Sequence, residues 1–213
     1  MMMIARHVHR PTRNVVNVLL GFCAYLLAHR GDEMSIRTRG TDFPTTYVDS
    51  SWGNDPATMR SWFGYCIMWA GCPFAFRSKL EPCVALSSRD AEAIAAVYAI
   101  KAMLGLLILL SELGMTPEAA PPLYVHIDNQ PVVDNANSSK VHRDSRHNAL
   151  RLRWIRERVE DGLIGVRKVA TSANVADVFT KELGPAAHRR FRAVLMGDAP
   201  MDSIALLMSP HGA

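Results

Sequence analysis

The sequence predicts an α/β domain in which helices pack on a mixed five-stranded sheet, and three observations support this. Three short β-type segments follow one another, a long apolar helical segment comes next, and two further β-type segments then alternate with helical ones. Of the 213 residues, 49% are hydrophobic and 21% are charged, as in a soluble globular protein. The length suits one main domain with a small appendage.

The five predicted strands are short runs of β-branched, aromatic and other apolar residues bounded by turn residues. They cover residues 45–49, 64–70, 74–77, 123–127 and 164–170. Gly71, Cys72 and Pro73 separate the second run from the third, which is hairpin spacing. The first three strands should therefore form an antiparallel meander.

The predicted helices show apolar residues at helical spacing and end at glycine or basic residues. They cover residues 15–28, 91–113, 146–160, 174–183 and 186–196. Ser88 is the expected N-cap of the long helix, with Glu92 in its first turn. In the third helix an inner stripe is expected between arginines, formed by Leu150, Trp154, Ile155 and Val159.

The chain is expected to divide into three segments. Residues 1–40 form a helical segment that ends in a polar linker, residues 44–197 form the main domain, and residues 198–213 form a loose tail without clear pattern. Arg6, Arg10 and Arg13 precede the apolar run 15–28, which resembles a secretory or transit peptide. Residues 93–110 contain Lys101 as their only charge, so they reach the length of a membrane span, although the context favours a buried core helix.

Charge and cysteine content bear on the partner and the compartment. Residues 140–192 hold 13 Lys/Arg against 6 Asp/Glu, while the rest of the chain is slightly acidic. Such a zone suits a polyphosphate partner, and a solvated Arg-rich helix face explains it equally well. The four cysteines have no zinc-ligand spacing and are expected to be reduced, buried thiols.

Four acidic residues are placed where carboxylates are often presented to a crevice. Asp49 and Asp128 end predicted strands, although each alone is better explained as a turn residue. Glu92 and Asp177 lie near the starts of predicted helices among apolar neighbours. If the four converge, cations must neutralise them, and oxygen ligands favour magnesium or manganese.

The order and spacing of several motifs resemble the ribonuclease H domain of copia-type retrotransposons, over about three quarters of the chain. The matching stretches are Tyr47-Val48-Asp49-Ser50-Ser51-Trp52, Arg77-Ser78-Lys79, Val84-Ala85-Leu86-Ser87-Ser88, Ala91-Glu92, His126-Ile127-Asp128-Asn129-Gln130, Ser145-Arg146-His147, Trp154-Ile155-Arg156-Glu157 and Ala176-Asp177-Val178-Phe179-Thr180-Lys181. The N-terminal segment, with Cys23-Ala24-Tyr25-Leu26, resembles that family's connection to the reverse transcriptase. The resemblance thus explains the signal-like N-terminus without targeting.

The resemblance implies a ribonuclease H-like mixed five-stranded sheet flanked by helices and preceded by an N-terminal helix. It also implies an endoribonuclease of a Pol polyprotein that hydrolyses the RNA strand of RNA/DNA hybrids by two-metal-ion catalysis. The implied catalytic and metal-binding residues are Asp49, Glu92, Asp128 and Asp177. They would hold two Mg²⁺ ions, with Mn²⁺ as a substitute.

The implied partners are the RNA/DNA hybrid and the reverse transcriptase portion of the parent polyprotein, with no membrane. Polar side chains would recognise 2′-hydroxyl groups and basic ones would follow the backbone phosphates. The expected nucleic-acid-binding residues are Ser88, Asn129, Gln130, Arg143, Arg146, His147, Arg151 and Arg153. The expected location is intracellular, in a cytoplasmic particle or the nucleus.

Three departures from the family's pattern support a second hypothesis. Ser51 replaces a common second acid, Asn148-Ala149 replace an Ile-Asp pair, and residues 105–110 are unusually apolar. A catalytically decayed or domesticated nucleic-acid-binding relic is therefore the alternative function. A membrane-anchored protein that uses residues 93–110 is the third hypothesis.

Overall fold

The computed structural model describes residues 11–34, 43–69, 71–115, 122–138, 146–201 and 203. The chain divides into two compact units, Met1–Met34 and Ser35–Ala213, and each is considered by itself. The expected division into residues 1–40, 44–197 and 198–213 stays a prediction.

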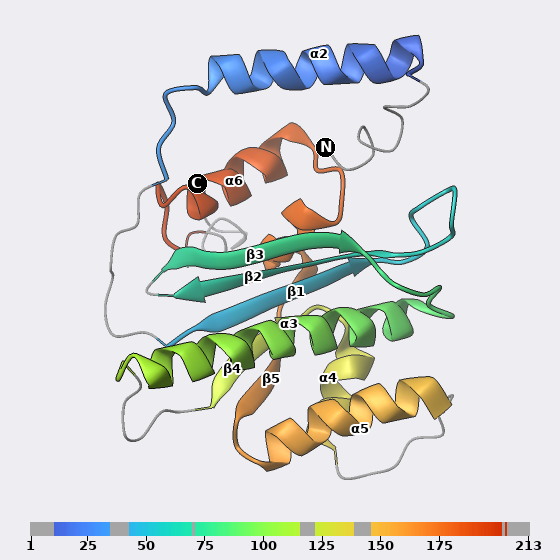
Figure 1. Ribbon diagram of the computed structural model, residues 1–213, viewed down its shortest axis with the longest axis vertical. Helices are drawn as coiled ribbons and strands as arrows, with labels where there is room; N and C mark the ends of the chain where they lie inside the picture. The colour runs from blue at the N-terminus through green and yellow to red at the C-terminus, as the bar shows by residue number, and fades with distance from the viewer. Residues whose placement is uncertain are drawn as a thin grey trace, which may run out of the picture. The chain divides into compact units, whose positions relative to one another are not determined.

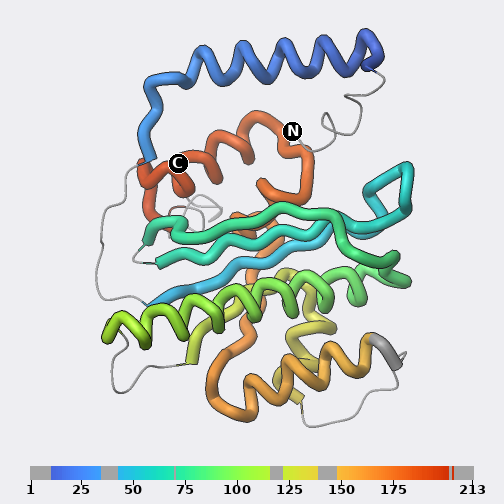
Figure 2. The backbone as a smooth tube through the Cα atoms, in the orientation of Figure 1, coloured from blue at the N-terminus to red at the C-terminus, as the bar shows by residue number. Residues whose placement is uncertain are grey.

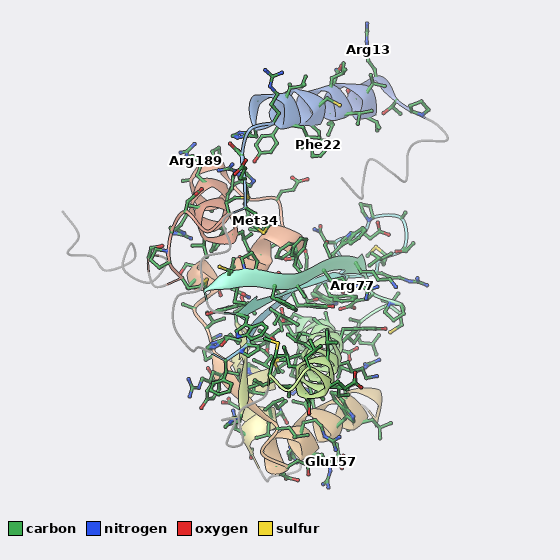
Figure 3. All side chains as sticks on the ribbon, turned by 60° about the vertical axis from the view of Figure 1, so that its left-hand side comes forward. Arg13, Phe22, Met34, Arg77, Glu157 and Arg189 are labelled. Carbon is green, nitrogen blue, oxygen red and sulfur yellow. The ribbon has the colours of Figure 1, made fainter. Side chains whose placement is uncertain are left out.

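The first unit contains helix α2 (Arg13–Ala28), which confirms the helix expected there. Its N-cap is Thr12, whose side chain accepts a hydrogen bond from the backbone N–H of Val15. None of its residues is buried, and the stick view shows side chains projecting all around the helix, with Arg13 near one end (Figure 3). Tertiary packing within this unit therefore does not explain the apolar character of α2.

The second unit is built on a five-stranded sheet with the order β3-β2-β1-β4-β5 (Figure 1). The strands are β1 (Thr45–Ser51), β2 (Trp62–Trp69), β3 (Cys72–Leu80), β4 (Leu123–Ile127) and β5 (Ile164–Lys168). The pairs β1/β2 and β2/β3 are antiparallel, while β1/β4 and β4/β5 are parallel. The mixed sheet is thus confirmed, although β3 is longer than predicted and β5 ends two residues earlier.

Helices cover both faces of the sheet, as the backbone trace shows (Figure 2). On one face lie α3 (Ser88–Glu112), α4 (Gln130–Asn137) and α5 (Arg146–Glu160), and the main core lies between them and the strands. On the other face lie the 3-10 turns η1 (Thr171–Ala173) and η2 (Val175–Phe179) and helix α6 (Pro185–Leu195). A smaller core fills that side, with Cys66, Met68, Val175, Phe191 and Val194 buried.

Helix α3 packs against β1, β2 and β4 and is both long and apolar. By length and hydropathy it meets the criterion for a membrane span, and half of its most apolar 18-residue window is buried. Its N-cap is Ser87, whose hydroxyl accepts a hydrogen bond of 3.1 Å from the Asp90 N–H, so the prediction of Ser88 was wrong by one residue.

The expected helix over 174–183 is instead the five-residue 3-10 turn η2. The reason is a tertiary contact: the Asn174 side chain donates to the Val48 carbonyl of β1 at 2.8 Å and accepts from the Ala176 N–H at 3.2 Å. These two bonds fix a tight turn against the sheet where an α-helix would not fit. Helix α4 was not among the predicted helices, and it begins at Gln130, directly after its N-cap residue Asn129.

In α5 the expected inner stripe was wrong at Leu150, which is 63% exposed. Ile155 is buried as predicted, and Leu152 and Arg156, which the prediction did not include, are buried as well, because α5 packs between α3, α4 and β5. The buried Arg156 guanidinium donates twice to the Asn135 carbonyl, through its Nε and one of its Nη groups, which satisfies two of its N–H donors. On the outer side of this helix, Glu157 forms an ion pair of 2.9 Å with Arg153 (Figure 3).

All four cysteines are free thiols, but the expectation that all are buried was wrong. Cys66 and Cys72 are buried, whereas Cys23 and Cys83 are exposed. Burial raises the pKa of the Cys66 thiol to about 12, so this side chain behaves as an apolar core residue.

Candidate metal centre

Asp49 lies inside β1 rather than at its end, because pairing with β2 continues to Ser51. Its side chain is fully buried. Both carboxylate oxygens have partners: the Lys181 ammonium donates to Oδ1 at 2.8 Å, and the Thr180 hydroxyl donates to Oδ2. Asp49 is thus a buried charge that is held from two directions.

Glu92 is in the first turns of α3 and points toward β1. The Ser50 N–H donates to its Oε1 at 3.1 Å. Its other oxygen, Oε2, is among the few buried side-chain atoms of the described residues that have no hydrogen-bond partner. Burial, and then the negative charges of Asp49 and Asp128, raise the pKa of Glu92 well above its ordinary value.

Asp128 directly follows β4, as the sequence predicted. Because β4 pairs in parallel with β1, with Ile127 opposite Val48, the carboxylates of Asp128 and Asp49 reach the same edge. Ligand atoms of Asp49, Glu92 and Asp128 all lie within 4.8 Å of one another. The sheet and α3 therefore bring together three of the four predicted carboxylates.

Asp177, on η2, is linked to this group through a lysine. The Lys181 ammonium lies 2.9 Å from Asp177 Oδ1 and 2.8 Å from Asp49 Oδ1. Burial and the charge of Asp49 raise the pKa of Asp177 to about 6, although Lys181 opposes this. Burial alone would lower the pKa of Lys181, but the carboxylates of Asp49 and Asp177 together raise it above its usual value.

Sequence reasoning did not assign a role to Thr180 or Lys181. They lie three and four residues after Asp177, and the N–H groups of both donate to the Asp177 carbonyl. This turn directs their side chains back over the cluster. The usable signal was a lysine and a threonine at this spacing from a predicted ligand.

Gly64 explains how η2 approaches β1 so closely. It is paired with Asp49 in the sheet register. A Cβ at this position would lie 2.5 Å from the Phe179 Cβ and 3.0 Å from the Thr180 Cγ2. The missing side chain thus makes room for the segment that carries Asp177, Thr180 and Lys181.

Glu81 is a further buried carboxylate that the sequence did not single out. It is fully buried at the end of β3, and the Ser50 hydroxyl donates to its Oε1 at 3.4 Å. Burial raises its pKa to about 7, although the hydroxyls of Ser61 and Ser50 oppose the shift. Ser50 therefore binds two carboxylates, because its hydroxyl donates to Glu81 and its N–H donates to Glu92. Glu81 thus contacts the cluster through Ser50.

The residues present fit a hard divalent cation. Three carboxylates supply oxygen ligands, and Glu92 Oε2 is a buried oxygen without a donor, which a cation would satisfy. Burial of like charges at this spacing is unfavourable unless positive charge is supplied. The cluster is therefore compatible with divalent-metal binding.

The predicted nucleic-acid-binding residues are only partly described. Ser88 and Gln130 are exposed, and Asn129 caps α4 by accepting from the Val132 N–H at 3.3 Å. Arg151 forms an ion pair of 2.8 Å with Asp90.

Arg153 pairs with Glu157 on the outer side of α5. Arg143 lies outside the described residues, and for Arg146 and His147 the structure describes only the backbone, in α5. The role of this whole set stays a prediction. Trp52 is 54% exposed, and its indole N–H donates to the Ala85 carbonyl.

Fold and site together define a class: an α/β domain that has the mixed five-stranded sheet expected from the resemblance and a buried acidic cluster at the edge of β1 and β4. Comparison with known proteins agrees with it. The chain is 36% identical over 135 residues to the retrovirus-related Pol polyprotein from transposon TNT 1-94 of Nicotiana tabacum. The matched residues make up 63% of the chain and 10% of that protein. It is 26% identical over 188 residues to the Pol polyproteins from transposons RE2 and RE1 of Arabidopsis thaliana, which covers 88% of the chain and 13% of each protein.

The expected resemblance to copia-type Pol polyproteins is therefore confirmed, and the chain spans about a tenth of the length of these relatives. No family model matches the chain.

Two solved structures illustrate the fold comparison. RNase H1 from Halobacterium salinarum NRC-1 has a TM-score of 0.44 and 16% identity, covering 73% of this chain and 98% of that one. LC11-RNase H1, solved in complex with an RNA/DNA hybrid, has a TM-score of 0.49 and 13% identity, covering 65% of this chain and 94% of that one.

Proposed function

We propose that this chain is a magnesium-dependent endonuclease that hydrolyses the RNA strand of RNA/DNA hybrids by two-metal-ion catalysis. The observation that carries the proposal is the convergence of Asp49, Glu92 and Asp128 within 4.8 Å, with Asp177 joined to Asp49 through Lys181. The similarity to Pol polyproteins supports it, because such polyproteins provide a context in which a hybrid arises.

In this proposal Asp49, Glu92 and Asp128 hold one cation, and Asp49 and Asp177 hold a second. When bound, divalent cations activate a water for attack on the phosphodiester and stabilise the leaving 3′-oxygen. The protein's own groups orient the ligands: the Ser50 N–H fixes Glu92, and the Thr180 hydroxyl fixes Asp49.

The hybrid would lie over the edge that carries Asp128. Asn129 and Gln130 directly follow Asp128, and exposed Ser88 lies one turn before Glu92 in α3, so all three are near the cluster in the chain. Their polar groups are suited to 2′-hydroxyl contacts. We also propose the reverse transcriptase portion of a parent polyprotein as the partner that delivers the hybrid.

The test is incubation of the purified chain with a hybrid labelled on either strand, in Mg²⁺ and in excess chelator. Cleavage of the RNA strand alone, dependent on metal and lost in Asp49→Asn, is the expected result. Asp161→Asn is the matched control, because Asp161 is a half-exposed carboxylate directly after α5 that pairs with Arg158 and does not belong to the acidic cluster. Metal-independent cleavage, or cleavage that survives Asp49→Asn, contradicts the proposal.

A catalytically decayed relic that binds nucleic acid is the other outcome of the same test. It predicts hybrid binding that persists in Asp128→Asn and no cleavage by the parent chain. A gel-shift assay run beside the cleavage assay separates the two functions.

A further inference from the structure

The contacts of Lys181 raise a question about the second cation position, because the ammonium already lies between Asp49 and Asp177. The distances to the two Oδ1 atoms are 2.8 and 2.9 Å, which are ion-pair hydrogen bonds. Both carboxylates are at least nine-tenths buried, while the lysine side chain is 33% exposed. A partly exposed cation thus bridges two buried anions.

We propose that Lys181 is a built-in counter-ion that fills the position between Asp49 and Asp177, so that a second divalent cation binds only by displacing its ammonium. This inference rests on the proposed metal-dependent function and assigns a role to a residue outside the predicted ligand set. It makes Lys181 a positioning residue for the ion-free centre and a competitor for the second ion.

The two halves of the cluster differ in a way that supports this assignment. The group formed by Asp49, Glu92 and Asp128 has a buried oxygen without a partner, Glu92 Oε2, which is ready to receive a cation. On the other side, Asp177 Oδ1 is already bound by Lys181, and Asp177 is not part of the three-residue group. The first half therefore keeps an unpartnered oxygen for an ion, at Glu92, whereas the lysine occupies the oxygens that face the second position.

Local structure favours a lysine that can leave. Its backbone N–H is held by the Asp177 carbonyl at 2.9 Å, so the main chain stays in place when the side chain moves. The side chain is flexible and partly exposed, so its ammonium can be released to water. A divalent ion carries twice the charge and binds both carboxylates more strongly than a single ammonium.

The first test measures Mn²⁺ binding without nucleic acid, by electron paramagnetic resonance titration of the whole chain. The parent is expected to bind one ion tightly and a second more weakly. In Lys181→Gln the second ion should bind about tenfold more tightly or better, because one opposing charge at close range has been removed. Lys181→Arg keeps the charge and should behave as the parent, and Lys79→Gln, an exposed lysine on β3, controls for net charge.

The second test uses the parent chain, so it holds even if a variant fails to fold. In ¹⁵N-lysine spectra, the Lys181 ammonium should give a protected signal in the ion-free protein. The signal should survive the first equivalent of Mg²⁺ and be lost with the second. A signal unchanged at saturation, or equal second-ion affinity in the parent and Lys181→Gln, overturns the inference.

Failure of the inference and failure of the proposed function have different signatures. If the parent cleaves the hybrid but the affinity for the second ion is the same in the parent and in Lys181→Gln, the function stands and the counter-ion role is wrong. If the affinity responds as expected but no RNA is cleaved, the counter-ion role stands and the nuclease function is wrong.

Discussion

Replacing Glu81 by glutamine should stabilise the protein at pH 8 and leave its stability nearly unchanged at pH 5. Burial raises the pKa of Glu81 from 4.5 to about 7 in the folded chain. The folded state therefore binds one more proton than the unfolded state between these values, and stability falls as pH rises through that window. Glutamine remains neutral and avoids the loss.

The size of the effect follows from the shift. A difference of about 2.5 pKa units, at about 1.4 kcal/mol each, gives a loss of roughly 3.5 kcal/mol above the folded pKa. This value is an upper bound on the stabilisation by Glu81→Gln, because the Ser61 and Ser50 hydroxyls bind the carboxylate better than they bind an amide.

The assay is urea unfolding followed by circular dichroism, for the parent and Glu81→Gln at pH 5, 6, 7 and 8 in excess chelator. Other titrating groups, including Glu92 and Asp177, cancel when the variant is compared with the parent. Glu160→Gln, at the exposed end of α5, is the matched control and should show no pH-dependent difference. A difference between Glu81→Gln and the parent that stays constant from pH 5 to pH 8 would refute the reasoning.

Three further predictions test the fold around the site. Gly64→Ala should lower stability by about 1–3 kcal/mol and weaken Mn²⁺ binding, because its Cβ would push Phe179 away from β2; urea unfolding and metal titration measure this. Leu152→Ala should cost about 2–5 kcal/mol in urea unfolding, whereas Leu150→Ala should change stability by less than about 0.5 kcal/mol, and equal costs would contradict the burial of α5. Ser87→Ala should cost about 1 kcal/mol by thermal unfolding, since it removes the cap of α3.

Much of the architecture followed from local patterns in the sequence. The runs at residues 123–127 and 146–160 matched β4 and α5 to the residue, because period-two and period-3.6 patterns reflect burial on one face. Strand-end and helix-start positions made Asp128 and Glu92 candidates, and the family resemblance implied them as metal ligands. The bounds of these strands and helices depend mainly on residues that are close together in the sequence.

Where tertiary contacts override local preference, only the structure was informative. Residues 174–183 have helical propensity, but the bond from Asn174 to Val48 converts them into a 3-10 turn. Which leucine of α5 is buried depended on its neighbours α3 and α4, which the sequence does not position.

The acidic centre shows the same division. Residue type and spacing in the sequence determined the choice of Asp49, Glu92, Asp128 and Asp177 as carboxylates that could share cations. Only the tertiary structure decided that three of them converge directly, that Lys181 bridges the fourth, and that Glu81 lies buried behind Ser50. The physical reason is that an ion pair or a burial energy depends on distances between segments far apart in the chain, which no local pattern encodes.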